Sequence, residues 1–152
     1  MYHYSMNTKN FKNHSVGVRF SVSDGGDDNI IIHCHSSYEI LYFIRGNVRY
    51  IIEGAEYNLK AGSLLLIPPN VVHGVKACGD GTYQRCVLDI YPKAFDLDGE
   101  NLLRMVFSSK CYYENTDGCG IGNAFDDIFS AAPLSDWALN ISVQALLIKI
   151  LL

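Results

Sequence analysis

The sequence predicts a mostly β fold, a small jelly-roll barrel followed by helices, and three observations lead to this prediction. Short runs of β-branched and aromatic residues alternate with turn residues from residue 15 to residue 91. Such close, regular spacing is typical of antiparallel sandwiches and barrels. After Pro92 the apolar residues recur at helical spacing instead. With 152 residues, 49% of them hydrophobic, the chain has the size of one domain with a substantial core.

Eight strands are expected before Pro92. Residues 15–21 alternate apolar residues with glycine and arginine, as a half-buried strand does. The other seven runs cover residues 30–35, 38–44, 48–52, 56–59, 63–67, 71–75 and 83–91. Residues 1–15 are rich in Asn, Lys and Tyr without periodicity and are expected to form a flexible arm, so the barrel spans residues 16–92.

Residues 93–152 are expected to form a helical segment. Its helices are predicted over residues 101–107, around Phe125 and over residues 136–152, with Ser135 as the N-cap of the last one. The last helix has two apolar stripes. The stripe expected to be buried contains Trp137, Ile141, Ala145 and Ile148. The stripe expected to remain available to a partner contains Leu139, Val143, Leu146 and Ile150.

The last helix is apolar on nearly all sides and ends at Leu152 without a glycine, asparagine or basic cap. One interpretation is a terminal helix buried against the barrel. We favour the other, in which the chain is part of a longer protein or the helix packs on a partner.

Composition excludes several classes of function. The net charge is −4 and Lys and Arg form no cluster, which argues against a chain that grips nucleic acid by itself. The five cysteines are odd in number and form no CxxC pair, which favours a reducing cytoplasm. The N-terminus lacks the apolar core of a signal peptide, and no uninterrupted apolar run reaches membrane-spanning length.

Four side chains between residues 33 and 73 are candidate metal ligands. His33 and His35 are separated by one residue, so in a strand both project from the same face, and Glu39 and His73 follow. Imidazole nitrogens and carboxylate oxygens are ordinary ligands of divalent transition metals, here Zn, Ni, Fe or Mn. The alternative is a polar, hydrogen-bonded cluster that lines a pocket without metal.

The spacing of these residues resembles the two sequence motifs of the cupin superfamily. His33, His35, Glu39 and Gly46 match the first motif, although Gly26 stands six residues before His33 where the pattern has five. Gly62, Pro68 and His73 match the second motif, which is separated from the first by 15 residues. The chain departs from the second motif at Asn70, where the pattern has glycine, and at Ala77, where it has asparagine.

The run YEILYFIRGNVRYIIEGAEYNLKAGSLLLIPPNVVHGV, with the arm before it and the helices after it, resembles the effector-binding domain of AraC-type transcriptional regulators. The resemblance covers nearly the whole chain. It implies a double-stranded β-helix barrel with His33, His35, Glu39 and His73 at its mouth, a small effector such as a sugar, and a homodimer. DNA would be bound by helix-turn-helix units that this chain lacks.

Three functions follow as hypotheses. The first is an effector-binding and dimerisation domain. Its pocket would use the quartet of candidate metal ligands (His33, His35, Glu39 and His73) together with Leu41 and Phe43. Its dimer interface would use Leu139, Val143, Leu146 and Ile150. Plain barrel core is the alternative for Leu41 and Phe43. The second is a metal-dependent cupin enzyme, either a dioxygenase or a sugar isomerase or epimerase. The third is a stand-alone sugar-binding cupin.

Overall fold

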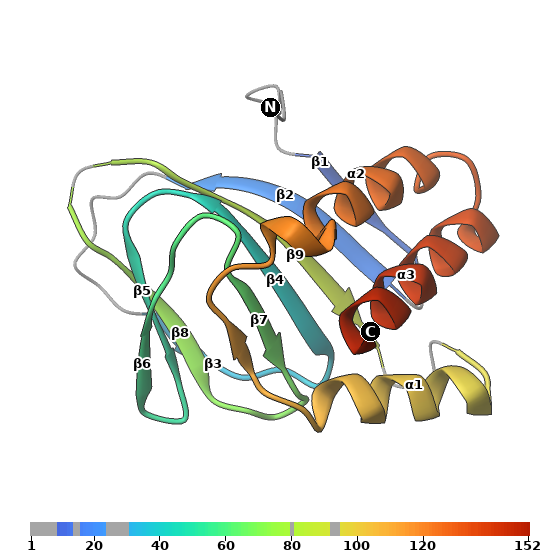
Figure 1. Ribbon diagram of the computed structural model, residues 1–152, viewed down its shortest axis with the longest axis horizontal. Coiled ribbons are helices and arrows are strands. Elements are labelled where there is room, and N and C mark those ends of the chain that lie inside the picture. Colours follow the sequence, from blue (N-terminus) through green and yellow to red (C-terminus); the bar gives the residue numbers. More distant parts are fainter. Residues whose placement is uncertain (1–8, 14–15, 24–30, 80, 92–94) are drawn as a thin grey trace.

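The computed structural model describes residues 9–13, 16–23, 31–79, 81–91 and 95–152. Two antiparallel sheets face each other on one side of the molecule, and the helices gather on the other (Figure 1). The mostly β fold with helices after it, expected from the sequence, is confirmed.

The larger sheet has six strands in the order β1-β2-β9-β4-β7-β10. Its first two strands are neighbours in sequence, whereas β9 lies between β2 and β4 through non-local pairing. The strands are β1 Lys9–Lys12, β2 Val16–Ser23, β4 Tyr38–Arg45, β7 Leu64–Ile67, β9 Tyr83–Ile90 and β10 Tyr112–Tyr113.

The smaller sheet has four strands in the order β3-β8-β5-β6. These strands are β3 Ile31–His33, β5 Val48–Ile52, β6 Ala55–Asn58 and β8 His73–Ala77. All eight predicted strands are therefore present, with ends shifted by a few residues.

Two of the described strands were not expected. Residues 9–12 belong to the predicted flexible arm, but they form β1, which pairs with β2 from Lys9 opposite Phe20 to Lys12 opposite Gly17. Asn13 is also described, and the remaining residues of that arm, 1–8 and 14–15, lie outside the described residues. The short β10 pairs with β7 from within the segment expected to be helical.

Strand alternation divides the interior into two apolar cores. On β4, Ile40 and Tyr42 point into the core between the larger sheet and the helices. Leu41 and Phe43, the residues that alternate with them, point into the core between the two sheets. Glu39 shares the second face and stands at its end, where the candidate metal ligands meet.

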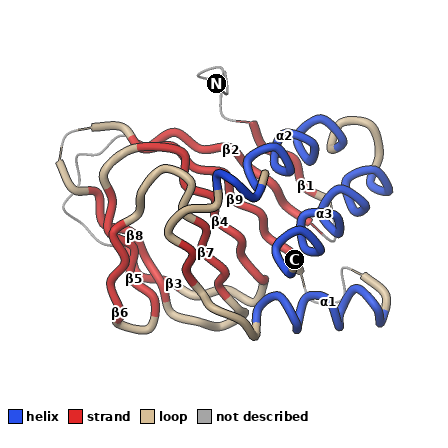
Figure 2. The backbone as a smooth tube through the Cα atoms, viewed as in Figure 1, coloured by secondary structure: helices blue, strands red, loops and turns tan. Residues whose placement is uncertain are grey.

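Three α-helices cover the outer face of the larger sheet (Figure 2). They are α1 Leu97–Phe107, α2 Ile121–Ala131 and α3 Asp136–Leu151, and a 3-10 turn, η1 Asp117–Cys119, precedes α2. Ser135 caps α3 as predicted, because its side chain accepts a hydrogen bond from the backbone N–H of Ala138. Among the described residues, no helix is long and apolar enough to cross a membrane.

The orientation of α3 is opposite to the predicted one. Leu139, Val143 and Leu146 are buried in the core beneath the helices, and Ile150 packs against that core. The stripe expected to be buried is the exposed one, since Trp137 is 74% exposed and Ile148 50% exposed. Both stripes are apolar, so periodicity could not decide between them, whereas packing against α1 and α2 does.

Candidate functional site

The candidate ligands meet because strand register brings them to the same end of the two sheets. In the smaller sheet His33 of β3 lies directly opposite His73 of β8. In the larger sheet Glu39 of β4 lies opposite both Ile67 and Asp89. Directly opposed residues of antiparallel strands share a face, so all these side chains project into the space between the sheets.

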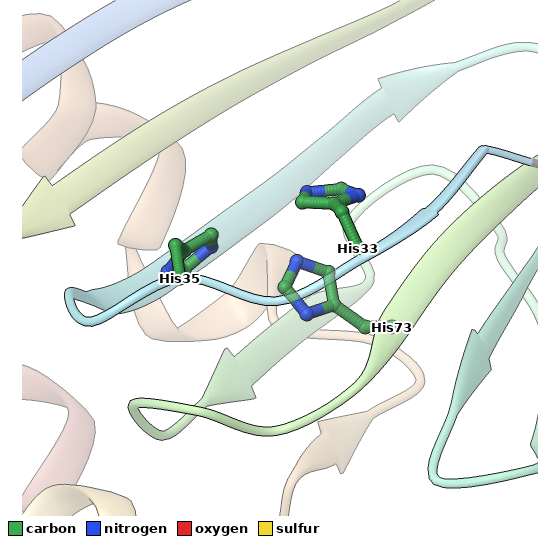
Figure 3. A group of neighbouring side chains, drawn as sticks. All are labelled: His33, His35 and His73. Carbon is green, nitrogen blue, oxygen red and sulfur yellow. The ribbon is translucent and has the colours of Figure 1, made fainter.

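The three imidazole rings surround a common space (Figure 3). Ring centroids are 4.3 Å apart for His33 and His73, 4.9 Å for His35 and His73, and 5.9 Å for His33 and His35. His35 lies just beyond the end of β3, which is shorter than the predicted strand, but its ring still reaches the group. One nitrogen from each histidine lies within 4.8 Å of the others, which is suitable spacing for ligands of one metal ion.

The fourth member, Glu39, is only 3% exposed and each of its oxygens has a different neighbour. Nε2 of His35 lies 3.1 Å from Oε2 of Glu39, and the hydroxyl of Tyr50 donates to Oε1 at 3.2 Å. Two donors thus satisfy a carboxylate that would otherwise be buried at high cost.

His73 is fully buried, and one of its ring nitrogens has no partner among the residues that the structure describes. Nδ1 lies 2.8 Å from the carbonyl oxygen of Val71, and because a carbonyl can only accept, Nδ1 carries the proton. Nε2 therefore exposes a lone pair 3.9 Å from Oε2 of Glu39, which is also an acceptor. Burial lowers the pKa of His73, so the ring is held neutral.

His35 is in the opposite electrostatic situation. Its hydrogen bond to Glu39 raises the pKa of His35, with smaller contributions from the charges of Glu39 and Asp89. Nδ1 of His35 lies 2.9 Å from the hydroxyl and 3.0 Å from the carbonyl oxygen of Ser37. The hydroxyl of Ser37 in turn points to Asp89 at 3.5 Å, a long contact for two oxygens.

These observations fit a divalent metal at the mouth of the barrel. A metal cation between the buried lone pair of His73 and the facing carboxylate oxygen of Glu39 would interact favourably with both. The far nitrogen of His73 and the far oxygen of Glu39 are each held by another group, as ligands of metal sites usually are. His35, Glu39 and Asp89 form a second group of atoms within 4.8 Å of one another.

The structure brings His33, His35 and His73 together with Glu39 beside them, while their role as metal ligands stays a prediction, and the other predicted contacts lie elsewhere. Leu41 and Phe43 face the space between the sheets, but they are packed in its core, so a ligand could reach them only if neighbours moved. Three of the four predicted dimer residues, Leu139, Val143 and Leu146, are buried within the chain and cannot meet a partner.

Sequence reasoning missed Ser37, Tyr50 and Asp89. Tyr50 alternates with two aliphatic residues along β5, so a hydroxyl on the inner face of that strand was a usable signal. Asp89 is an acid near the end of an otherwise largely apolar strand, but its place beside Glu39 depends on a non-local pairing.

The turns that frame the site account for one departure from the cupin pattern. Gly46 has a φ of 124° and a side chain there would lie 2.4 Å from Cβ of Tyr83, so only glycine fits. Asn70 stands where the pattern has glycine and has a φ of 64°. Asparagine tolerates this left-handed conformation better than most residues, so the turn before His73 is kept.

Comparisons with known proteins agree with this geometry. The AraC-like ligand binding domain family matches residues 18–151. A cupin protein from Bacteroides fragilis has a TM-score of 0.53 at 18% identity, with 63% of this chain and 86% of that one covered. A protein of unknown function from Streptococcus pyogenes has a TM-score of 0.50 at 16% identity, with 59% and 76% covered.

A third structure, salicylate 1,2-dioxygenase from Pseudoaminobacter salicylatoxidans, has a TM-score of 0.45 at 19% identity, with 50% and 22% covered. That likeness is too weak to carry an argument about reaction. No curated protein matches the chain. The family match spans both the barrel and the helices that cover it, and the chain belongs to the AraC-like ligand binding domain family.

Proposed function

We propose that this chain is the effector-binding and dimerisation domain of an AraC-type transcriptional regulator, with the effector bound at the mouth of the barrel beside a divalent metal. The observation that carries the proposal is the group of His33, His35, Glu39 and His73 in a chain of this family. The metal is Zn, Ni, Fe or Mn, since imidazole and carboxylate ligands suit all four.

Exposure increases across the group, which supports entry of the effector from one side. His73 is fully buried, the side chain of His35 is 25% exposed, and His33 is exposed. The barrel below the group is filled by residues such as Leu41 and Phe43. The effector is therefore a small molecule that stays near the mouth and approaches from the side of His33.

Polar groups around the mouth support a polyhydroxylated effector such as a sugar. The metal supplies a Lewis acid for hydroxyl oxygens, while the carboxylate of Asp89 and the hydroxyl of Ser37 can exchange hydrogen bonds with further hydroxyls. Such polar groups orient a ligand, because a bound ligand displaces their water and must replace the hydrogen bonds that the water made.

The exposed stripe of α3 supports a homodimer. The residues Trp137, Ile141, Ala145 and Ile148 recur every three or four positions, so they form a continuous apolar face. We assign this stripe to a second copy of the chain, in place of the buried stripe expected from the sequence. DNA contact is assigned to a further domain, in keeping with a net charge of −4 in this one.

A thermal-shift screen of chelator-treated protein with sugars, each with and without Ni²⁺, tests the effector-binding part. We expect one sugar to raise the Tm of the wild type, because a ligand that binds only the folded state stabilises it. The rise should disappear in His35→Ala. A rise of equal size in that variant would refute binding at the mouth.

A metal-dependent cupin enzyme is the second candidate. One observation favours it, namely that the carboxylates of Glu39 and Asp89 both lie beside the imidazole of His35 and could handle protons of a metal-bound substrate. Turnover or oxygen uptake that requires the metal would support this candidate over the sensor. A sugar that binds without turnover supports the sensor.

A further inference from the structure

Tyr50 is a buried neighbour of two candidate metal ligands, Glu39 and His73. It lies at the centre of β5, opposite Val75 on one side and Tyr57 on the other, and is only 4% exposed. Its strand belongs to the smaller sheet, whereas Glu39 belongs to the larger one. The hydroxyl of Tyr50 therefore links the two sheets through its hydrogen bond to Glu39.

The hydroxyl determines which oxygen of Glu39 faces the histidines. A carboxylate only accepts hydrogen bonds, so Tyr50 donates to Oε1 at 3.2 Å. The other oxygen, Oε2, is the one that lies 3.1 Å from Nε2 of His35 and 3.9 Å from Nε2 of His73. Without the donor, the carboxylate could rotate and lose this orientation.

The ring of Tyr50 also limits the movement of His73. The two rings are nearly parallel, at 11°, with centroids 6.2 Å apart, which is within the range of offset stacking. The carbonyl of Val71 already holds the far nitrogen of His73. One tyrosine thus contacts two of the candidate ligands, and Tyr50 itself lies between the two cupin motifs and belongs to neither.

We propose that Tyr50 is a positioning residue of the metal centre, which fixes Oε2 of Glu39 and the ring of His73 toward the cation without binding it. The inference rests on the metal part of the proposed function. Groups that orient metal ligands in this way commonly change metal affinity by about 10- to 100-fold when they are removed.

Titration calorimetry of Ni²⁺ with chelator-treated protein tests the proposal. Tyr50→Phe keeps the ring and removes the hydroxyl, and we expect Ni²⁺ affinity to fall by about 10- to 100-fold. The matched control is Tyr57→Phe on the neighbouring strand, since the hydroxyl of Tyr57 contacts Sγ of Cys111 instead. We expect affinity in that variant to stay within about twofold of wild type.

A double-mutant cycle separates positioning from general packing. In a Glu39→Ala background the hydroxyl has lost its acceptor, so adding Tyr50→Phe should change Ni²⁺ affinity by no more than about twofold. Urea unfolding checks that each variant is folded, and Tyr50→Met replaces Tyr50→Phe if the latter is not.

Each outcome bears on a different part of the account. If the wild type binds Ni²⁺ and Tyr50→Phe binds it with the same affinity, the role of Tyr50 is overturned and the metal proposal stands. An equal loss in Tyr57→Phe, or a full loss in the Glu39→Ala background, would also overturn that role. Wild-type protein that binds no Ni²⁺ would overturn the metal proposal and this inference with it.

Discussion

The two faces of β4 separate two kinds of interior. Ile40 and Tyr42 enter the core between the larger sheet and the helices, where the hydroxyl of Tyr42 donates a hydrogen bond to Asp117. Leu41 and Phe43 enter the core between the sheets, which continues into Glu39 and the buried imidazole of His73. One strand therefore serves both a largely apolar layer and a polar site.

The difference indicates where stability and function reside. The helix-side core gains free energy mainly from apolar burial, and among the described residues its helix α3 leaves one buried side-chain oxygen, Oδ1 of Asn140, without a partner. The mouth of the barrel keeps a lone pair of His73 without a partner among the described residues, at a cost that a bound cation would offset. Changes in the first region should alter stability alone, and changes in the second should alter ligand response.

The largest effect on stability is expected from the helix-side core. Phe125 is fully buried there, so Phe125→Ala should lower the free energy of unfolding by about 3–5 kcal/mol. Urea unfolding measures this loss. Calorimetry with Ni²⁺ on the folded variant should give the wild-type affinity, and a tenfold weaker affinity would contradict the separation of the two regions.

The next largest effect is expected from metal binding at the mouth. At a Ni²⁺ concentration of a hundred times its Kd, the free energy of unfolding of the wild type should rise by about 2.7 kcal/mol. His73→Gln removes the buried imidazole and should abolish this rise. Phe125→Ala serves as the control, because it should show the same rise from a lower starting value.

The pH dependence of metal-free protein should distinguish His73 from His35. Burial lowers the pKa of His73 below its ordinary value of 6.5, so the folded chain binds fewer protons and loses stability as the pH falls through the folded pKa. The hydrogen bond to Glu39 raises the pKa of His35, so its contribution is complete below 6.5 and is lost as the pH rises through the folded pKa.

Together these two shifts favour maximal stability near pH 6.5 from this pair. Urea unfolding with a chelator present, on both sides of that pH, measures the effect. Below pH 6.5, His73→Gln should remove the part of the loss in free energy of unfolding that comes from His73. Above pH 6.5, His35→Gln should remove the part of the loss that comes from His35. An unchanged acid-side slope in His73→Gln would show that its buried imidazole is not the group responsible.

The smallest effect on the stability of the single chain is expected on the exposed stripe of α3. Ile141 is 46% exposed, so Ile141→Asp should change the free energy of unfolding of the monomer by only about 0.5 kcal/mol. Sedimentation velocity at micromolar concentration should nevertheless report a change from dimer to monomer. Met105→Asp on α1, also at an exposed apolar residue, is the matched control and should leave the dimer intact.

Local pattern predicted the barrel and the quartet well. Alternation along the chain and the motif spacing depend on nearby residues, and they located the eight strands, the cap at Ser135 and the cluster of three histidines with Glu39. Contacts between strands that are far apart in sequence could not be predicted from this local pattern. Residues 9–12 form a strand because β2 offers them an edge, and Asp89 meets Glu39 because β9 lies beside β4.

The reversed face of α3 has a related cause. Both of its stripes are apolar, so the sequence predicts a helix that is attractive to neighbours on two sides. Which stripe is buried depends on where α1 and α2 lie, and that follows from the tertiary structure. Tyr50 was missed for the same reason, since its contact with Glu39 crosses from one sheet to the other.

The most direct test of the account is the stoichiometry of metal binding to chelator-treated wild-type protein, measured by calorimetry with Ni²⁺. The arrangement of His33, His35, Glu39 and His73 predicts one ion bound per chain, with binding at that site lost in His73→Gln. Equal Ni²⁺ binding by the two proteins, or no binding by the wild type, would contradict the central claim that the mouth of the barrel is a metal centre.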